Sequence, residues 1–323
     1  MSCRLNSPTI LFSAPGNFIG PSTRGEWEKQ YSLRFHPVRG PAELPSVPTV
    51  RAWIPDPGQT FVAGAGLVEN FPSLEVVVTP STGSNHLDRE SLEARGIAVR
   101  SLLDDRPSLD RIRASSEFTL LLVLASLRRF PTALAELDAG RWRHREEAMR
   151  GREVEGRRIG IVGLGRNGTN VADWLGAMGA EVRYYDPSPR TREGRTNSLE
   201  ELFATSEVLV LTLSLQESTR GLVDRALLER LPREAHLINT SRGEIVAEPD
   251  LVAFLADRPD VAYAADVVCG EVEGRPLESP LYELYRQGRI LLTPHIAGAT
   301  VDSQTKAAVA AVRMAAEHLG LPA

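Results

Sequence analysis

The chain has few of the features that would place it in several protein classes. Its 323 residues include only two cysteines, Cys3 and Cys269, which match neither a disulfide framework nor a zinc-ligand spacing. The net charge of −5 argues against nucleic acid or an anionic membrane as a partner. The longest apolar run, Phe118 to Leu127, is about half as long as a bilayer span requires.

The start of the sequence lacks the charged segment and apolar core of a secretory signal. This absence and the scarcity of cysteine together predict a cytoplasmic protein with no metal site. The length is sufficient for two domains. Hydrophobic residues make up 42% of the chain and charged residues 24%, as in ordinary globular proteins.

A glycine-rich turn is the most informative stretch. The apolar segment Ile159–Val162 predicts a buried parallel strand, and Gly163, Gly165 and Gly168 follow it with the spacing G-x-G-x-x-G. Gly163 permits the tight turn, Gly165 lets the backbone approach a pyrophosphate, and Gly168 allows a helix to pack closely on the strand. A helix is predicted at 169–178, and its first N–H groups would point at the phosphates.

The strand predicted at 180–186 ends on an acidic residue, Asp186. A carboxylate at this position accepts hydrogen bonds from a ribose 2′-hydroxyl, which favours NAD over NADP. Arg190, Arg192 and Arg195 follow and would tolerate a 2′-phosphate, but Asp186 would repel it. The stretch therefore predicts a βαβ unit that binds NAD.

Predicted strands and helices alternate along the rest of the chain, which indicates an α/β protein with parallel, doubly wound sheets. Before residue 106, the predicted strands are 9–13, 31–35, 50–54, 74–78 and 97–101, and the predicted helices are 60–70 and 88–95. An apolar helix at 115–130 and a polar helical arm at 131–150 precede the glycine-rich turn. After it come helices at 198–204, 224–230 and 248–256 and strands at 208–213, 236–239, 261–266 and 290–293. The last helix, 300–319, is too short to form a domain and is expected to pack on the first unit.

Three polar residues stand just after predicted strands, where open α/β sheets bind ligands. Arg242 follows the strand at 236–239 and offers a planar, permanently charged fork to a carboxylate. His295 follows the strand at 290–293 and is of the type that passes a proton near neutral pH. Glu271, shortly after the strand at 261–266, is a carboxylate that would orient this histidine. Because the three side chains share one edge of the predicted sheet, a joint catalytic role is favoured over a separate structural role for each.

Two further residues have competing interpretations. His86 lies in the small, polar stretch Pro80–Asp88 after a predicted strand, where a surface turn histidine is favoured over a substrate contact. Cys269 has no activating base beside it in the sequence, so a small packed residue is favoured over a nucleophile.

With these motifs in place, the chain resembles the D-isomer-specific 2-hydroxyacid dehydrogenase family, the relatives of 3-phosphoglycerate, D-lactate, glyoxylate/hydroxypyruvate and formate dehydrogenases. The resemblance extends from about Val76 to Thr300. Its strongest parts are the glycine turn with Asp186, the segment Asn239–Gly243 and the segment Thr293–Thr300. The resemblance implies two Rossmann-like domains with the active site in the cleft between them.

The family pattern also implies domain limits and partners. Residues 1–106 and 297–323 would form a discontinuous substrate-binding domain, and residues 107–296 the NAD-binding domain. The arm at 110–150 resembles the family's dimerisation region, so a homodimer is expected. The expected ligands are NAD and a small anionic substrate.

Residue roles are carried over from the family onto the matching positions. Arg242 would bind the substrate carboxylate, His295 would be the general acid/base and Glu271 its partner. The turn of Ser81, Thr82 and Gly83 would supply backbone N–H groups to the substrate carboxylate. The residues implied to contact the cofactor are Gly163, Gly165, Arg166, Asn167, Gly168, Asp186, Leu213, Thr240, Ser241, Arg242, Asp266, His295 and Gly298.

Several alternatives stay open. Val272 stands where the family usually has proline after the catalytic glutamate, so Glu273 competes with Glu271 for the partner role. The substrate is either a 2-hydroxy acid or a related small anion such as a hydroxyphosphonate, which would require an extra cation. Arg34, Arg39 and Arg51 are candidates for that cation. A non-catalytic NAD(H) sensor that binds protein partners is the alternative from a different class.

Overall fold

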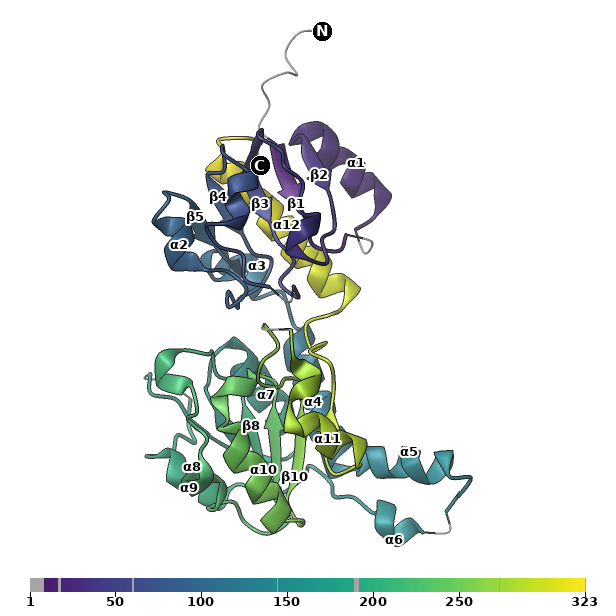
Figure 1. Ribbon diagram of the computed structural model, residues 1–323. Helices are drawn as coiled ribbons and strands as arrows, with labels where there is room; N and C mark the ends of the chain where they lie inside the picture. Colours follow the sequence, from purple (N-terminus) through teal and green to yellow (C-terminus); the bar gives the residue numbers. More distant parts are fainter. Residues whose placement is uncertain are drawn as a thin grey trace. The chain divides into compact units, whose positions relative to one another are not determined.

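The computed structural model describes residues 9–16, 19–59, 61–143, 145–188, 192–272 and 274–322. The chain forms two compact units (Figure 1). The first contains Met1–Ile112, Val272–Gly274 and Ala299–Ala323, and the second contains Arg113–Glu271 and Arg275–Gly298. Leu109 and Ile112 belong to the hydrophobic core of the first unit.

Five parallel strands form the sheet of the first unit, in the order β2-β1-β3-β4-β5. Their bounds are β1 Thr9–Phe12, β2 Leu33–Phe35, β3 Val50–Ile54, β4 Val76–Val78 and β5 Ala98–Arg100. Each lies within one of the five predicted strands. Alternate residues of β1 face opposite cores: Ile10 and Phe12 belong to one cluster and Leu11 to the other.

The helices of the first unit agree less well with the prediction. They are α1 Pro21–Gln30, α2 Arg89–Glu93, α3 Arg106–Leu109 and α12 Val301–His318, with short 3-10 turns at Pro41–Glu43, Leu67–Asn70 and Leu102–Asp104. Asp88 caps α2 by accepting a hydrogen bond from the Ser91 N–H, as expected. The helix predicted at 60–70 is wrong at 61–66, because Ala63 pairs with Leu87 as an isolated β-bridge, and residue 60 lies outside the described residues.

The last helix, α12, packs on the first unit as expected. Its buried face consists mainly of alanines, including Ala308, Ala311 and Ala315, which join the core cluster of β1 and β3. Small side chains let a helix approach a sheet closely, so this face fits against the strands without large protrusions. The first unit is therefore discontinuous in sequence.

Six parallel strands form the sheet of the second unit, in the order β11-β10-β9-β8-β6-β7. Their bounds are β6 Arg158–Val162, β7 Glu181–Tyr185, β8 Val208–Leu211, β9 His236–Asn239, β10 Ala262–Ala265 and β11 Leu291–Leu292. Ile161 and Leu211 lie in separate hydrophobic clusters on the two faces of this sheet. The predicted α/β class with two parallel, doubly wound sheets is confirmed.

Helices cover both faces of the second sheet. They are α4 Ala114–Leu127, α5 Phe130–Asp138, α6 Glu146–Met149, α7 Arg166–Ala177, α8 Leu199–Thr205, α9 Arg225–Leu228, α10 Glu248–Asp257 and α11 Pro280–Arg286. Three 3-10 turns lie at Glu217–Thr219, Gly243–Ile245 and Pro276–Glu278. Figure 1 shows α5 and α6 extending from the rest of this unit as the arm expected from the sequence. Helix α11 was not predicted from the sequence.

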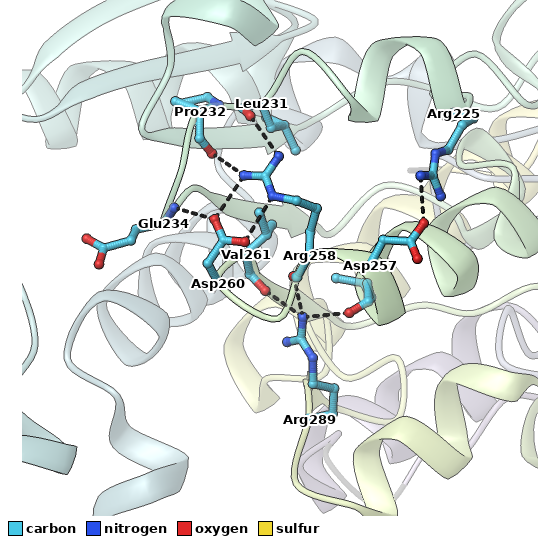
Figure 2. Close-up of polar contacts among 10 residues, drawn as sticks. Arg225, Leu231, Pro232, Glu234, Asp257, Arg258, Asp260, Val261 and Arg289 are labelled. Carbon is cyan, nitrogen blue, oxygen red and sulfur yellow. Dashed lines mark hydrogen bonds and ion pairs between the residues drawn. The ribbon is translucent and has the colours of Figure 1, made fainter.

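Two arginines fasten the end of α10 to the neighbouring strand starts (Figure 2). Arg258 forms a bidentate pair with Asp260, both bonds being 2.9 Å, and also donates to the carbonyl of Pro232. This pairing holds the pKa of the Asp260 carboxyl well below its usual range. Arg289 donates to the carbonyls of Leu255, Arg258 and Val261, two of which lie at the carboxyl end of α10. A cation suits that end because the helix dipole is negative there.

Among the described residues, no single helix has the length and apolar character to cross a membrane, and one bent pair, Arg106–Leu127 with Phe130–Asp138, meets that test only when taken together.

The side chain of His236 predicts how stability depends on pH. His236 lies at the start of β9, where its Nδ1 is 2.7 Å from the Ser126 hydroxyl. Burial and the nearby cations Arg129 and Arg157 lower its pKa to about 4. The unfolded chain takes up a proton near pH 6.5 and the folded chain does not, so acid favours unfolding. We expect roughly 1–2 kcal/mol less stability at pH 5 than at pH 7 from this group.

Urea unfolding at the two pH values measures this effect. In a His236→Gln chain, the part of the pH dependence due to this group should disappear, whereas the same exchange at exposed His36 should leave the dependence unchanged. An equal loss of stability at pH 5 in His236→Gln and in the unmodified chain would contradict the assignment.

Candidate active site

The glycine turn connects β6 to α7 in a geometry that only glycine permits. Gly163 has a φ of +91°, and Gly168 lies so close to β6 that a Cβ there would be 2.1 Å from the Gly163 carbonyl oxygen. Thr212, just after β8, donates to the same carbonyl at 2.6 Å. A Cβ at Gly165 would meet nothing within 4 Å, and no side chain caps α7. The helix therefore begins with open backbone at the place where a pyrophosphate is expected.

Asp186 closes this turn from the end of β7. One carboxylate oxygen accepts a hydrogen bond from the Leu164 N–H at 2.8 Å, and the other accepts one from the Ser188 N–H at 2.8 Å. The side chain thus holds the glycine turn as well as standing at the expected ribose position. Of the three nearby arginines, Arg192 pairs with Asp173 and Arg195 donates to the Asp186 carbonyl. Arg190 lies outside the described residues.

A second turn follows β9 and presents Thr240, Ser241 and Arg242. Buried Asn239 organises it: its amide oxygen accepts from the Ser241 N–H at 3.0 Å, and its amide nitrogen donates to the Arg242 carbonyl at 3.1 Å. The Ser241 hydroxyl accepts from the Leu213 N–H at 2.9 Å, which joins this turn to the end of β8. The sequence analysis quoted Asn239 in a motif but gave it no role. Its position directly before three site residues is the signal that it positions them.

Hydroxyl groups link this turn to α4. The Thr119 hydroxyl lies 2.7 Å from the Thr240 hydroxyl and donates to the Ser115 carbonyl at 2.7 Å. Because Thr119 uses its only proton on that carbonyl, Thr240 is the donor in the pair. The Thr240 oxygen is left with acceptor capacity. Thr119 is a further positioning residue that the sequence analysis did not assign.

Residues at the start of α4 also contact the start of α7. The Ser116 hydroxyl donates to the Asn167 side-chain oxygen at 3.0 Å, next to Arg166 in the first turn of α7. Gly298 belongs to the same unit, and a Cβ there would be 3.7 Å from the Ser115 hydroxyl. Asn167, in the first turn of α7, and Gly298 therefore both lie beside the first turn of α4.

Asp266 holds the loop that carries His295. Its carboxylate accepts hydrogen bonds from the Thr293 hydroxyl at 2.6 Å, from the Ile296 N–H at 3.0 Å and from the Ala297 N–H at 2.7 Å. The His295 N–H donates to the Asp266 carbonyl at 2.9 Å. Burial is the main cause that raises the pKa of the Asp266 carboxyl above its usual value, against these hydrogen bonds. The observed contacts of this side chain are with the loop.

His295 and Glu271 form the closest pair of titratable groups in the site. His295 Nδ1 lies 2.5 Å from Glu271 Oε2, and the other Glu271 oxygen accepts from the Val268 N–H at 2.8 Å. The His295 side chain is 45% exposed. His295 has a φ of +53°, a conformation that L side chains rarely adopt. Glu273 lies outside the described residues.

The backbone turn that carries Arg242 packs against the backbone that leads to Glu271. A Cβ on the adjacent Gly243 would lie 2.0 Å from the Val268 carbonyl carbon, so the Arg242 turn packs directly on the segment before Glu271. Burial lowers the pKa of the Arg242 guanidinium from its usual value, and the charges of Glu271 and Glu244 oppose that shift. One guanidinium nitrogen donates to the Ser241 carbonyl at 2.6 Å. Of the described residues, no carboxylate forms an ion pair with it, so its charge is available to an anion.

Cys269 behaves as the sequence analysis favoured. Burial is the main cause that raises the pKa of its thiol to about 12, and the nearby carboxylate of Glu248 acts in the same direction. A thiol with so high a pKa stays protonated and is a poor nucleophile. The residue is a packed neighbour of the site.

The turn of Ser81, Thr82 and Gly83 belongs to the first unit, after β4. A chain of hydrogen bonds runs from His86 Nε2 to the Thr79 hydroxyl at 3.0 Å, to the Ser81 hydroxyl at 2.9 Å and to the Gly83 carbonyl at 2.6 Å. A carbonyl only accepts, so every proton in the chain points toward Gly83 and His86 donates from Nε2. The expectation of a surface histidine is wrong: His86 is buried and supports the turn from within.

Several known proteins resemble this chain in sequence and in fold. Residues 120–297 match the family described as "D-isomer specific 2-hydroxyacid dehydrogenase, NAD binding domain". A D-3-phosphoglycerate dehydrogenase of Mycobacterium tuberculosis is 30% identical over 312 residues, which are 94% of this chain and 55% of the relative. The chain thus spans about half the length of that relative. A glyoxylate reductase of Aeropyrum pernix is 33% identical over 264 residues, 78% of this chain and 74% of the relative.

A solved structure of a Thermus thermophilus protein has the same fold, with a TM-score of 0.81 and 27% identity over 97% of both chains. The second unit also fits the family's cofactor on its own geometry. The open backbone at Gly165, the close packing at Gly168 and the buried carboxylate of Asp186 stand where a dinucleotide is held. The chain belongs to the D-isomer specific 2-hydroxyacid dehydrogenase family, and its cofactor is NAD.

Proposed function

We propose that the chain is an NAD-dependent oxidoreductase acting at C2 of a small D-2-hydroxy acid or 2-keto acid, or of a closely related anion such as a hydroxyphosphonate. The 2.5 Å contact between His295 and Glu271 carries the proposal. A carboxylate at this distance fixes the orientation and the tautomer of the ring, as a general acid/base requires. Packing of the turn after Arg242 against the segment before Glu271 supports a role for this cation beside the pair.

Each of the four polar residues of the candidate site has its own role in the proposed reaction. Arg242 binds the substrate carboxylate and stabilises negative charge that develops on the C2 oxygen. His295 accepts the hydroxyl proton in oxidation and returns it in reduction, while Glu271 holds the imidazole. Asp266 keeps the His295 loop in place. NAD, when bound, supplies the hydride chemistry.

The remaining expected contacts concern the cofactor and the substrate carboxylate. The cofactor would be held by Gly163, Gly165, Arg166, Asn167, Gly168, Asp186, Leu213, Thr240, Ser241 and Gly298. The acceptor capacity left on Thr240 suits the amide N–H of the nicotinamide. In the first unit, Ser81, Thr82 and Gly83 would receive the substrate carboxylate on backbone N–H groups. The first unit is thus assigned to substrate and the second to NAD.

Reduction of a panel of 2-keto acids, measured by the loss of NADH absorbance, tests the proposal. The panel includes glyoxylate, pyruvate, hydroxypyruvate, phosphohydroxypyruvate and phosphonopyruvate. We expect turnover of at least one compound, with kcat/KM reduced by about 10²-fold or more in Arg242→Ala, because a charged, desolvated contact to the transition state is lost. The absence of turnover on every compound, with NADH still bound, would favour the sensor alternative and overturn the proposal.

The arm is proposed to form a homodimer. Four apolar side chains on α5 and just after it are largely exposed, namely Phe130, Leu134, Leu137 and Trp142. Clustered exposed apolar groups indicate a protein interface. Sedimentation equilibrium of the full chain should give twice the chain mass, and a monomer would contradict this assembly. A cytoplasmic location accords with the low cysteine content and is part of the same proposal.

A further inference from the structure

A cavity of about 500 Å³ opens in the first unit at the carboxyl ends of β1, β2 and β3. Its lining includes Gly16 after β1, Arg39 after β2, Asp56 after β3, and Arg24 from α1. In a sheet of order β2-β1-β3-β4-β5, the winding reverses between β1 and β3. Such switch points are where open α/β sheets bind ligands, and the volume is in the range of small-molecule sites.

Packing holds one guanidinium of the cavity in place. The Arg24 guanidinium carbon lies 4.1 Å from the centre of the Phe35 ring. Phe35 is itself packed against Phe12 and Trp27, with ring centres 5.2 Å and 6.4 Å away. A Cβ at Gly16 would lie 3.0 Å from the Phe35 ring, which is closer than an ordinary contact, so a larger residue there would press on the ring. Stacking on an aromatic face positions a guanidinium and leaves its edge donors free for an anion.

The charges of the cavity favour an anion. Arg39 uses its backbone N–H to donate to Glu43 at 2.8 Å, while among the residues that the structure describes no carboxylate forms an ion pair with the side chain of Arg24 or Arg39. Of the lining residues within the described part of the chain, Asp56 alone is acidic. One of its oxygens accepts from the Gly58 N–H at 2.9 Å. Burial raises the pKa of this carboxyl above its usual value, and the two guanidinium groups of the lining outnumber it.

The cavity shares one sheet edge with the Ser81–Gly83 turn. That turn follows β4, and β4 pairs with β3, whose end forms one wall of the cavity. Neighbouring strands are about 4.8 Å apart, so the ends of β1 and β2 lie roughly 10–15 Å along the sheet edge from the end of β4. A ligand with one acidic group at the turn can therefore place a second one in the cavity.

We propose that this cavity binds a second, remote acidic group of the substrate, through Arg24 and Arg39. The substrate class is then a 2-hydroxy or 2-keto acid with a distal carboxylate or phosphate. This inference rests on the proposed function and narrows its substrate. Of the arginines that the sequence suggested as an extra cation, Arg39 lines the cavity. Arg51 instead pairs with Glu75.

The test compares diacids with monoacids of equal carbon number. Reduction of 2-oxoglutarate, 2-oxoadipate, 2-oxopimelate and 2-oxosuberate is measured against the matching 2-oxo monocarboxylates. We expect the unmodified chain to prefer the diacid at one or more lengths. The ratio of kcat/KM for diacid over monoacid should fall about tenfold in Arg24→Gln and in Arg39→Gln, the usual worth of a charged hydrogen bond. Arg34→Gln removes an exposed arginine of β2 outside the cavity lining, and it should keep the ratio.

Two results would overturn the assignment. One is equal use of diacids and monoacids at every length, and the other is a diacid preference that survives in the Arg24→Gln, Arg39→Gln double variant. If no keto acid turns over, the proposed function fails, and calorimetric titration then decides the cavity separately. Tighter binding of 2-oxoadipate than of 2-oxohexanoate, lost in the double variant, would support the anion subsite. Equal binding of the two compounds would overturn it.

Discussion

A His295→Asn chain is expected to lose roughly 10²–10⁴-fold in kcat, the range for removing a positioned general acid/base. Asparagine is the sharpest replacement because it tolerates the left-handed backbone, where His295 has a φ of +53°. The backbone bond from residue 295 to the Asp266 carbonyl and the three hydrogen bonds that Asp266 accepts from its loop should therefore persist. What is lost is the ring nitrogen beside Glu271.

Steady-state assays of NADH oxidation on the preferred keto acid measure this loss. NADH binding, followed by its fluorescence, and the thermal midpoint should both stay near those of the unmodified chain. A His36→Asn chain is the matched control, because it makes the same exchange at an exposed position of the first unit. Retention of more than about a tenth of kcat in His295→Asn would rule out its role as the acid/base.

Glu271 should be coupled to His295. Because Glu271 Oε2 contacts His295 Nδ1, Glu271→Gln should also lower kcat, and adding it to His295→Asn should cost little more. Residues that act as one unit show this non-additivity. Glu273→Gln is the control that separates the two glutamates left open by the sequence. A larger loss in Glu273→Gln than in Glu271→Gln would transfer the partner role to Glu273.

The strands were predictable because parallel strands buried on both faces are short, continuous apolar runs. Val50–Ile54 and His236–Asn239 were predicted with the bounds they have in the structure. Local patterns were less informative where tertiary contacts decide. Ala63 lies in a region predicted as helix, but its backbone pairs with Leu87 from a distant turn. The helix α1 was not predicted from the sequence, because it follows Gly20, contains Gly25 and has only Trp27 buried on it, which leaves little helical pattern.

Local sequence patterns were also insufficient where tertiary contacts build the candidate site. As predicted, Arg242, Glu271 and His295 each follow a strand of the second sheet, namely β9, β10 and β11. The motifs did not reveal what holds these residues. Thr119 is 121 positions from Thr240, and no local spacing predicts that their hydroxyls meet. The cations of the first unit could not be assigned for the same reason: whether an arginine pairs with an acid or lines a cavity depends on the folded chain.

A Gly168→Ala chain is expected to be destabilised by roughly 1–3 kcal/mol or more, the cost of forcing an atom into a packed site. The added Cβ would lie 2.1 Å from the Gly163 carbonyl oxygen and 2.7 Å from the Thr212 hydroxyl. The first contact is with backbone and the second is with a short side chain, so neither can be relieved by rotating a long side chain. The first turn of α7 must move away from β6, and with it the N–H groups expected to bind the pyrophosphate.

Gly176 offers a matched control in the same helix. A Cβ there meets nothing within 4 Å, so Gly176→Ala should keep or raise stability by up to about 1 kcal/mol, the helix propensity difference. Urea unfolding measures both variants, and NADH fluorescence measures cofactor binding, which should weaken only in Gly168→Ala. If Gly168→Ala were as stable as the unmodified chain and bound NADH equally well, close packing of α7 on β6 would not be what this glycine provides. Loss of stability with unchanged NADH binding would instead separate the packing role of Gly168 from the binding role of the turn.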